Sequence, residues 1–212
     1  MPRVYLWMLV ALSVTAVVAW TVYNSPTLRE FFFANPWISL GLFIGQLVLV
    51  VALSAAIQRL STPVAMLIFF AYAALTGIVF ASIFMAYTQT SIASTFVATA
   101  GLFGVLSIIG FTTGRDLTKA GNIAIVALIG IIIASLINFF LRSEALYWVI
   151  SIAGVLIFVV LIARDSQKLK QMATQVDVNS EQGSKASIMG ALILYLDFIN
   201  LFMFLLRIFG RR

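Results

Sequence analysis

Seven long apolar stretches, separated by shorter polar segments, run along the whole chain. They cover residues 4–23, 37–58, 63–87, 92–113, 121–141, 145–163 and 186–207. Each has about the 20 residues that an α-helix needs to cross the hydrocarbon core of a bilayer. The one long polar segment, residues 164–185, is expected to continue the sixth helix into water before it becomes a loop. The pattern predicts an all-α membrane protein, with seven transmembrane helices in a single domain over residues 1–212.

The composition supports a membrane protein and removes most catalytic chemistry. Hydrophobic residues make up 63% of the chain and charged residues 9%, whereas a soluble domain usually carries about 25% charged residues. The chain has no cysteine and no histidine, which excludes disulfides, thiol chemistry, a His/Cys zinc site and a histidine-based triad. No glycine loop precedes a lysine in phosphate-binding form. We therefore expect a protein that is not an enzyme, and any proton sensing must use carboxyl groups.

The charge pattern predicts the orientation in the membrane. The net charge is +6, but the basic residues cluster at the ends of apolar runs, which indicates the positive-inside rule rather than nucleic-acid binding. One side carries Arg3, Arg59, Arg115, Lys119, Arg164, Lys168, Lys170 and Lys185; the other carries Arg29, Arg142, Arg207, Arg211 and Arg212. The first side has more, so we predict a cytoplasmic N-terminus, although the C-terminal arginines count against it. The first apolar run exceeds the roughly 7–15 residues of a signal-peptide core, so it is interpreted as a retained helix, and the location as a bacterial plasma membrane.

Asp197 is the main candidate functional residue. It lies in the middle of the last apolar stretch, "ALILYLDFINLF" over residues 191–202. A charged residue at the centre of a membrane helix costs about 2.5–3.5 kcal/mol on insertion scales, so we expect this helix to be shielded by others. Asn200 and Tyr195 are predicted as supporting residues: Asn200 lies one turn further on about the same face, and Tyr195 is close in sequence but points elsewhere. The alternative is that Asp197 only ties helices together through hydrogen bonds.

Two further charged residues lie at the predicted cytoplasmic ends of helices. Asp165 ends the sixth apolar stretch in "RDSQK", and Arg59 ends the second in "SAAIQRLSTP". Taken alone, Asp165 is typical of a solvated boundary residue and Arg59 of a membrane anchor. The glycine pairs of "GLFIG" (41–45) and "GFTTG" (110–114) have a spacing that allows close helix packing, which is a weak signal.

The last helix resembles a known family. Its sequence "LYLDFINLFMFLLRIFG" (194–210) is similar to the final helix of the Bax inhibitor-1 family, also called the transmembrane Bax inhibitor motif family. The helix count agrees, as do the acid in "LIARDSQKLK", the small residues in "ALTGIVFASIF" and the arginine that closes the second helix. The resemblance implies a fold in which the seventh helix is central and the other six wrap around it.

The resemblance also implies a function, a pH-sensitive calcium leak. In the family, the acids that match Asp165 and Asp197 form a hydrogen-bonded pair, and the arginine that matches Arg59 can contact it as a latch. Two carboxyls in contact share a proton and titrate as a coupled pair. After deprotonation they would repel each other unless a cation lay between them, and Ca²⁺ prefers oxygen ligands. Asp165 and Asp197, with support from Asn200, would form a weak and transient site, so Ca²⁺ is expected as the transported ion rather than as a bound cofactor.

One departure and two alternatives remain. Some bacterial relatives carry an acid within the second helix, where this chain has only Gln46, so a path lined by that acid must differ here. One alternative is a regulatory protein that modulates a membrane-bound AAA protease, which the few residues before the first helix disfavour. The other is an intramembrane aspartyl protease, which needs two acids inside the bilayer and a GxGD context, whereas this chain has "LYLDF".

Overall fold

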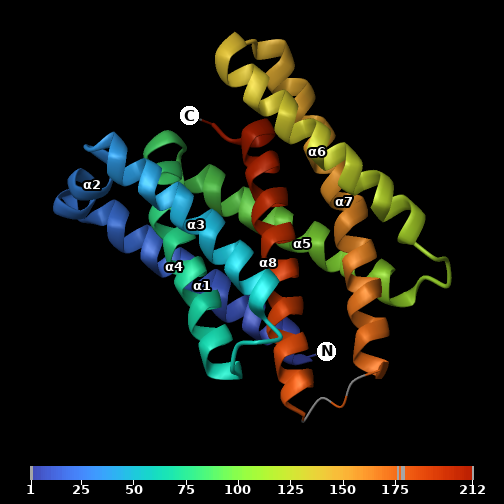
Figure 1. Ribbon diagram of the computed structural model, residues 1–212. Helices are drawn as coiled ribbons and strands as arrows, with labels where there is room; N and C mark the ends of the chain where they lie inside the picture. The colour runs from blue at the N-terminus through green and yellow to red at the C-terminus, as the bar shows by residue number, and fades with distance from the viewer. Residues whose placement is uncertain (1, 176, 178–179, 212) are drawn as a thin grey trace. The chain divides into compact units, whose positions relative to one another are not determined.

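The computed structural model describes residues 2–175, 177 and 180–211, and this part of the chain contains eight helices and no strand. The helices are α1 (Pro2–Asn24), α2 (Pro26–Phe33), α3 (Pro36–Ala56), α4 (Thr62–Ala86), α5 (Gln89–Thr112), α6 (Thr118–Leu141), α7 (Glu144–Gln175) and α8 (Glu181–Phe209) (Figure 1). All except α2 are long and apolar enough to cross a membrane. The prediction of an all-α protein with seven transmembrane helices is therefore confirmed.

The short helix α2 was not predicted, because its segment was interpreted as a break between spans. Its ends are set by two similar turns. Ser25 precedes Pro26, and the Ser25 side chain accepts a hydrogen bond from the backbone N–H of Leu28 (3.4 Å). Asn35 precedes Pro36, and its side chain accepts from the N–H of Trp37 (2.9 Å). A capping side chain followed by proline favours helix initiation, so the prolines start two helices here.

The chain divides into two compact units, and the prediction of a single domain stays a prediction. The first unit comprises Met1–Thr88 and Met172–Tyr195, and the second comprises Gln89–Gln171 and Leu196–Arg212. The helix α8 is continuous across the boundary at residues 195 and 196.

In the first unit, α4 packs against both α1 and α3. The backbones of α1 and α4 approach closely at Gly77, where a Cβ atom would lie 2.7 Å from the carbonyl oxygen of Thr15. The Thr15 hydroxyl donates to the carbonyl of Ala73 (2.9 Å) and lies 2.7 Å from the hydroxyl of Tyr195. The ring of Tyr195 packs edge-on against Phe69. Small and hydroxyl-bearing residues thus hold these helices together, as is common where the surroundings are apolar.

In the second unit, the end of α8 packs against α5 and α7. The Phe198 ring lies 5.3 Å from that of Phe96 and 5.5 Å from that of Phe103, both on α5. The Phe204 ring lies 5.9 Å from that of Phe158 on α7. The aromatic side chains of one helix therefore fix its contacts with two others.

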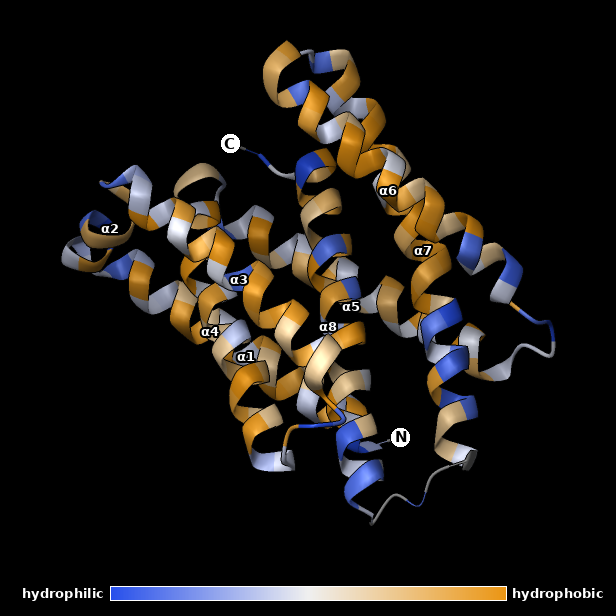
Figure 2. Ribbon diagram, in the orientation of Figure 1, coloured by the Kyte–Doolittle hydropathy of each residue, from blue (hydrophilic) through white to orange (hydrophobic). Residues whose placement is uncertain are grey.

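The distribution of polarity agrees with a membrane protein. Figure 2 shows hydrophobic residues along the long helices and hydrophilic ones at the connections and in the last turns of α7. The most apolar part of α8 has 67% of its residues buried. The corresponding share is at most 39% in each of the other six spans. A shielded last helix is what a central position requires, but the wrapping of the other six helices around it stays a prediction.

Candidate functional site

The second unit brings Asp165 and Asp197 to the same seam between α7 and α8. Along this seam Tyr147 on α7 contacts Arg207 on α8, and Phe158 contacts Phe204, so the two helices run antiparallel. Asp165 lies two helical turns after Phe158 on α7. Asp197 lies two turns before Phe204 on α8. Residues seven apart lie on nearly the same face of a helix, so the two acids face each other across the seam.

Both acids are buried, and one carboxyl oxygen has no partner. Asp197 is 6% exposed and Asp165 is 9% exposed. The Oδ2 atom of Asp197 is buried without a hydrogen-bond partner among the described residues. The charges of Asp165 and Arg164 both act on the Asp197 carboxyl. A buried polar atom without a partner is costly, so this carboxyl stays the main candidate for a functional group.

Arg164 is the cation of this site. Its Nη1 atom donates to Oδ1 of Asp165 at 2.5 Å. Among the described residues, no hydrogen bond joins Asp165 directly to Asp197, although the resemblance implies one; Oδ1 of Asp165 is bound to Arg164 instead. Adjacent helical residues do not face the same side, so the long arginine side chain must bend around the helix to reach its neighbour.

A glycine on α6 makes room for this arginine. Gly121 is buried, and a Cβ atom there would lie 2.5 Å from Cγ of Arg164 and 2.8 Å from its Cδ. The sequence interpretation counted Arg164 only as one of the cytoplasmic charges and did not single out Gly121. The available signal was the sequence "RD" itself, in which a cation directly precedes the candidate acid.

The segment of α7 that carries Asp165 is anchored on its other side to the end of α5 and the following loop. Ser166, Gln167 and Lys170 all bind there. The Ser166 hydroxyl donates to the Ser107 hydroxyl (3.3 Å). The Gln167 side chain accepts from the N–H of Leu117 (3.0 Å) and donates to the carbonyl of Arg115 (2.8 Å). The Lys170 ammonium donates to the carbonyl of Phe111 (2.8 Å). These three residues share one face of α7. The face that carries Asp165 is thereby held towards α8.

The remaining predicted site residues are described by their own contacts. Asn200 is half-buried, and its Nδ2 donates to the carbonyl of Leu196 (2.8 Å), which leaves its Oδ1 as an acceptor. Tyr195 belongs to the first unit, where its hydroxyl lies beside that of Thr15. Arg59 also belongs to the first unit and lies exposed in the turn after α3, so its role as a latch stays a prediction.

Gln46, the polar residue deep in the second span, has a partner within the first unit. Its Nε2 donates to the hydroxyl of Thr76 (3.0 Å), which in turn donates to the carbonyl of Tyr72 (2.9 Å). The amide is therefore accommodated by hydrogen bonds between α3 and α4. Such bonds between helices satisfy polar groups that lipid cannot.

The candidate metal ligands form a sparse set. In the described ranges, no group of three or more histidine, cysteine, aspartate or glutamate side chains lies close enough to hold a metal ion. Asp165 and Asp197 could offer two carboxylates, with the Asn200 oxygen nearby on the same helix. A long-lived Ca²⁺ site uses six to eight oxygen ligands, so a site built on this pair would be a transient one, and it stays a prediction.

Comparison with known proteins identifies the family. A sequence model of the family described as "Inhibitor of apoptosis-promoting Bax1" matches residues 1–212. The "Inner membrane protein YbhL" of Escherichia coli (strain K12) is 54% identical over 213 residues, which cover 100% of this chain and 91% of that protein. Proteins described as uncharacterised from Borreliella burgdorferi and Deinococcus radiodurans are 42% and 41% identical, over 99% and 100% of this chain and 90% of each relative. With its seven membrane-spanning helices and its acid in the last one, the chain belongs to the Bax inhibitor-1 family.

Proposed function

We propose that this membrane protein lets Ca²⁺ pass down its gradient, and that a proton shared by Asp165 and Asp197 controls the passage. The observation that carries the proposal is the buried Asp197 carboxyl, which has one oxygen without a partner and feels the charges of Asp165 and Arg164. Ionisable groups inside a membrane protein typically mark ion paths and proton relays. The name of the Escherichia coli relative places that protein in an inner membrane, so we propose a bacterial plasma membrane here too.

The charges of the three residues explain how one proton could act as a switch. With one proton on the pair, the remaining carboxylate and Arg164 cancel, so the buried cluster is neutral. Loss of that proton leaves two carboxylates against one guanidinium, which is a net charge of −1. An uncompensated charge in a low-dielectric site is strongly unfavourable, so the deprotonated cluster must either rearrange or attract a cation.

Calcium suits the oxygen ligands on offer, and weak binding suits conduction. Ca²⁺ is a hard cation that takes carboxylate, carbonyl and water oxygens. A site must bind an ion well enough to admit it and weakly enough to release it, which two carboxylates and an amide oxygen can provide. Arg59 remains the candidate latch that neutralises the pair from outside it. In this proposal the chain catalyses no covalent chemistry and holds no resident cofactor.

Calcium influx into liposomes tests the proposal. The purified protein is reconstituted with an internal calcium dye, and influx is measured at about pH 6, 7 and 8 for the wild type, Asp165→Asn and Asp197→Asn. We expect the wild-type rate to change with pH by up to about tenfold per unit, the limit for one proton, and this dependence to disappear in both variants. The control is Asp116→Asn, which changes an exposed loop acid and should keep the wild-type profile.

Two outcomes would contradict the proposal. Influx no faster than in empty liposomes at any pH would remove the leak function and direct the search to a protein partner, as the regulatory alternative requires. A pH profile that survives in Asp197→Asn would show that the proton switch lies elsewhere.

A further inference from the structure

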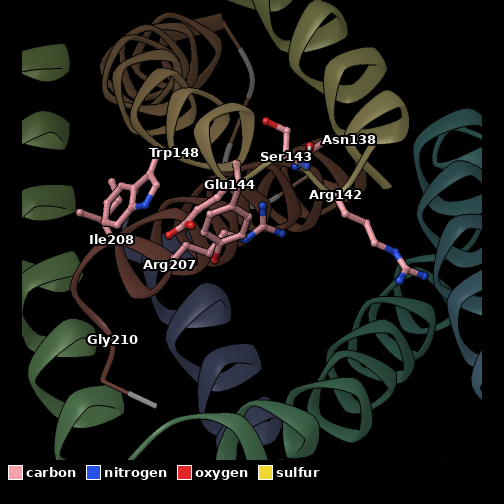
Figure 3. A pocket seen from close by; sticks show the side chains of 9 residues that line it. Asn138, Arg142, Ser143, Glu144, Trp148, Arg207, Ile208 and Gly210 are labelled. Atoms are coloured by element: carbon pink, nitrogen blue, oxygen red, sulfur yellow. Dashed lines mark hydrogen bonds between the residues drawn. The ribbon is translucent and has the colours of Figure 1, made fainter. Parts of the chain in front are cut away.

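A second polar site lies in the second unit, at the far end of the seam between α7 and α8. It is a pocket of about 440 Å³ whose lining includes Asn138, Arg142, Glu144, Tyr147, Trp148 and Arg207 (Figure 3). These residues come from the end of α6, the start of α7 and the end of α8. The site is separate from the acid pair, because Arg207 lies nearly three helical turns beyond Asp197 on α8.

The pocket is lined by two arginines, Arg142 and Arg207, and by one acid, Glu144. The Arg207 guanidinium lies over the rings of Tyr147 and Phe204, 5.8 and 5.4 Å from their centroids. Glu144 lines the same pocket, and among the described residues neither Arg207 nor Glu144 forms an ion pair. Figure 3 shows both side chains in the pocket, while the Arg142 side chain extends away from them. The site thus offers a donor and an acceptor of opposite charge to one ligand.

The turn between α6 and α7 fixes the position of Glu144. Arg142 has a φ of 51°, the left-handed region, which no other non-glycine residue of the described chain adopts. Its N–H donates to the carbonyl of Asn138 (2.8 Å), and the N–H of Ser143 donates to the Asn138 side chain (2.9 Å). The Ser143 hydroxyl accepts from the N–H of Leu146 and so caps α7. Non-glycine residues in this conformation are uncommon and cluster at ligand-binding sites, so the tight turn itself favours a built pocket.

The surroundings of the pocket are those of a membrane interface. Tryptophan and tyrosine, here Trp148 and Tyr147, are enriched where lipid headgroups meet the hydrocarbon core. Next to the pocket, at the ends of α6 and α8, large apolar side chains point outwards: Phe139, Phe140 and Phe209 are 74%, 77% and 68% exposed. A ligand with acyl chains could cover these side chains while its polar head occupies the pocket.

We propose that this pocket binds the phosphoethanolamine headgroup of a membrane phospholipid. Its phosphate would accept charge-assisted hydrogen bonds from Arg207, and its primary ammonium would donate to Glu144. The zwitterion matches the opposite charges of the pocket, whereas a headgroup with phosphate alone would leave Glu144 unpaired. The proposal also gives Arg207 a role on the side predicted to be outside, where the positive-inside rule disfavours basic residues. It does not depend on the calcium proposal.

Native mass spectrometry of the protein released from nanodiscs tests the recognition of the phosphate. The nanodiscs contain phosphatidylcholine with an equal share of phosphatidylethanolamine or phosphatidylglycerol, and the lipids retained per protein are counted. We expect the wild type to retain one phosphatidylethanolamine in preference to the other two, and Arg207→Gln to retain roughly tenfold less. The matched control is Arg211→Gln, which removes a nearby arginine that does not line the pocket and should retain the lipid.

A second variant tests the ammonium contact and keeps the proposal open to disproof if Arg207→Gln misfolds. Glu144→Gln changes an exposed side chain and should bind phosphatidylethanolamine and phosphatidylcholine equally, because the preference for a primary ammonium is lost. Equal retention of all three lipids by the wild type, or a preference for phosphatidylglycerol, would overturn the proposal. Displacement of the retained lipid by soluble phosphoethanolamine would show that the ligand is the free headgroup rather than the lipid.

Discussion

Replacing Asp197 by leucine is expected to increase the free energy of unfolding by about 1–3 kcal/mol, the usual cost of a buried polar group without a partner. Leucine branches at Cγ as aspartate does, so the side chain keeps its shape while Oδ2, which has no partner, becomes a methyl group. The ion pair between Arg164 and Asp165 remains. The same change should abolish the pH dependence of calcium influx, because one of the two proton-sharing groups is gone. A gain in stability with a loss of function is typical of residues kept for a task.

Thermal unfolding in detergent, followed by tryptophan fluorescence, measures this effect. The control is Asp116→Leu, at an exposed aspartate whose carboxylate accepts a hydrogen bond from the backbone N–H of Thr118 (2.9 Å). The hydrogen bonds from Thr118 lower the pKa of Asp116, so its ionised form favours the folded state and its removal should not stabilise the protein. A lower unfolding temperature for Asp197→Leu than for the wild type would mean that the Asp197 carboxyl makes a stabilising bond.

Replacing Gly110 by alanine is expected to destabilise the protein by roughly 1–3 kcal/mol, the usual cost of overpacking. Gly110 is buried on α5 against α7, where a Cβ atom would collide with the carbonyl oxygen of Ala163 and lie 2.9 Å from Cβ of Ser166. A backbone atom cannot turn away as a flexible side chain can, so the two helices must separate. Because Ala163 and Ser166 flank Asp165, the calcium influx should change as well.

The matched control on the same helix is Gly101→Ala. No described atom lies within 4 Å of a Cβ at this exposed position, and alanine favours a helix over glycine by up to about 1 kcal/mol. Comparison of the unfolding temperatures of the two variants isolates the contact between α5 and α7 from helix propensity. Equal temperatures would mean that this close approach does not hold the helices together.

The hydrophobic pattern was sufficient to predict the seven spans, because a bilayer demands length and apolarity of each of them. The continuation of the sixth helix beyond its apolar stretch also followed from the sequence, and α7 extends to Gln175. The helix α2 was missed because the two prolines were interpreted as breakers. Each follows a capping residue, Ser25 or Asn35, so each instead begins a helix.

The two glycine motifs show that residue spacing alone does not predict where helix backbones come into close contact. Of the four glycines in "GLFIG" and "GFTTG", only Gly110 lies at a close approach of backbones. Gly45 makes an ordinary contact with Leu75 at 3.5 Å, and no described atom lies within 4 Å of a Cβ at Gly41 or Gly114. The spacing allows close packing, but the partner helix decides whether it occurs.

The site was predicted in part, and the missing part depends on three dimensions. Asp197 was visible as an acid inside an apolar helix, and its link with Asp165 came from the family resemblance. The register of α7 against α8, set by contacts such as that of Phe158 with Phe204, brings the two acids together. Arg164 was overlooked as a member because its place there depends on the space above Gly121, which no sequence pattern reveals.

A double-mutant cycle of calcium influx tests the central claim most directly. Influx between about pH 6 and pH 8 is compared for the wild type, Asp165→Asn, Asp197→Asn and the double variant. If the two carboxyls share one proton and act as a unit, each single change removes the pH dependence and the double variant behaves like either one, because residues in one network are not additive. If the two single effects instead add in the double variant, the acids act independently and the shared-proton gate is contradicted.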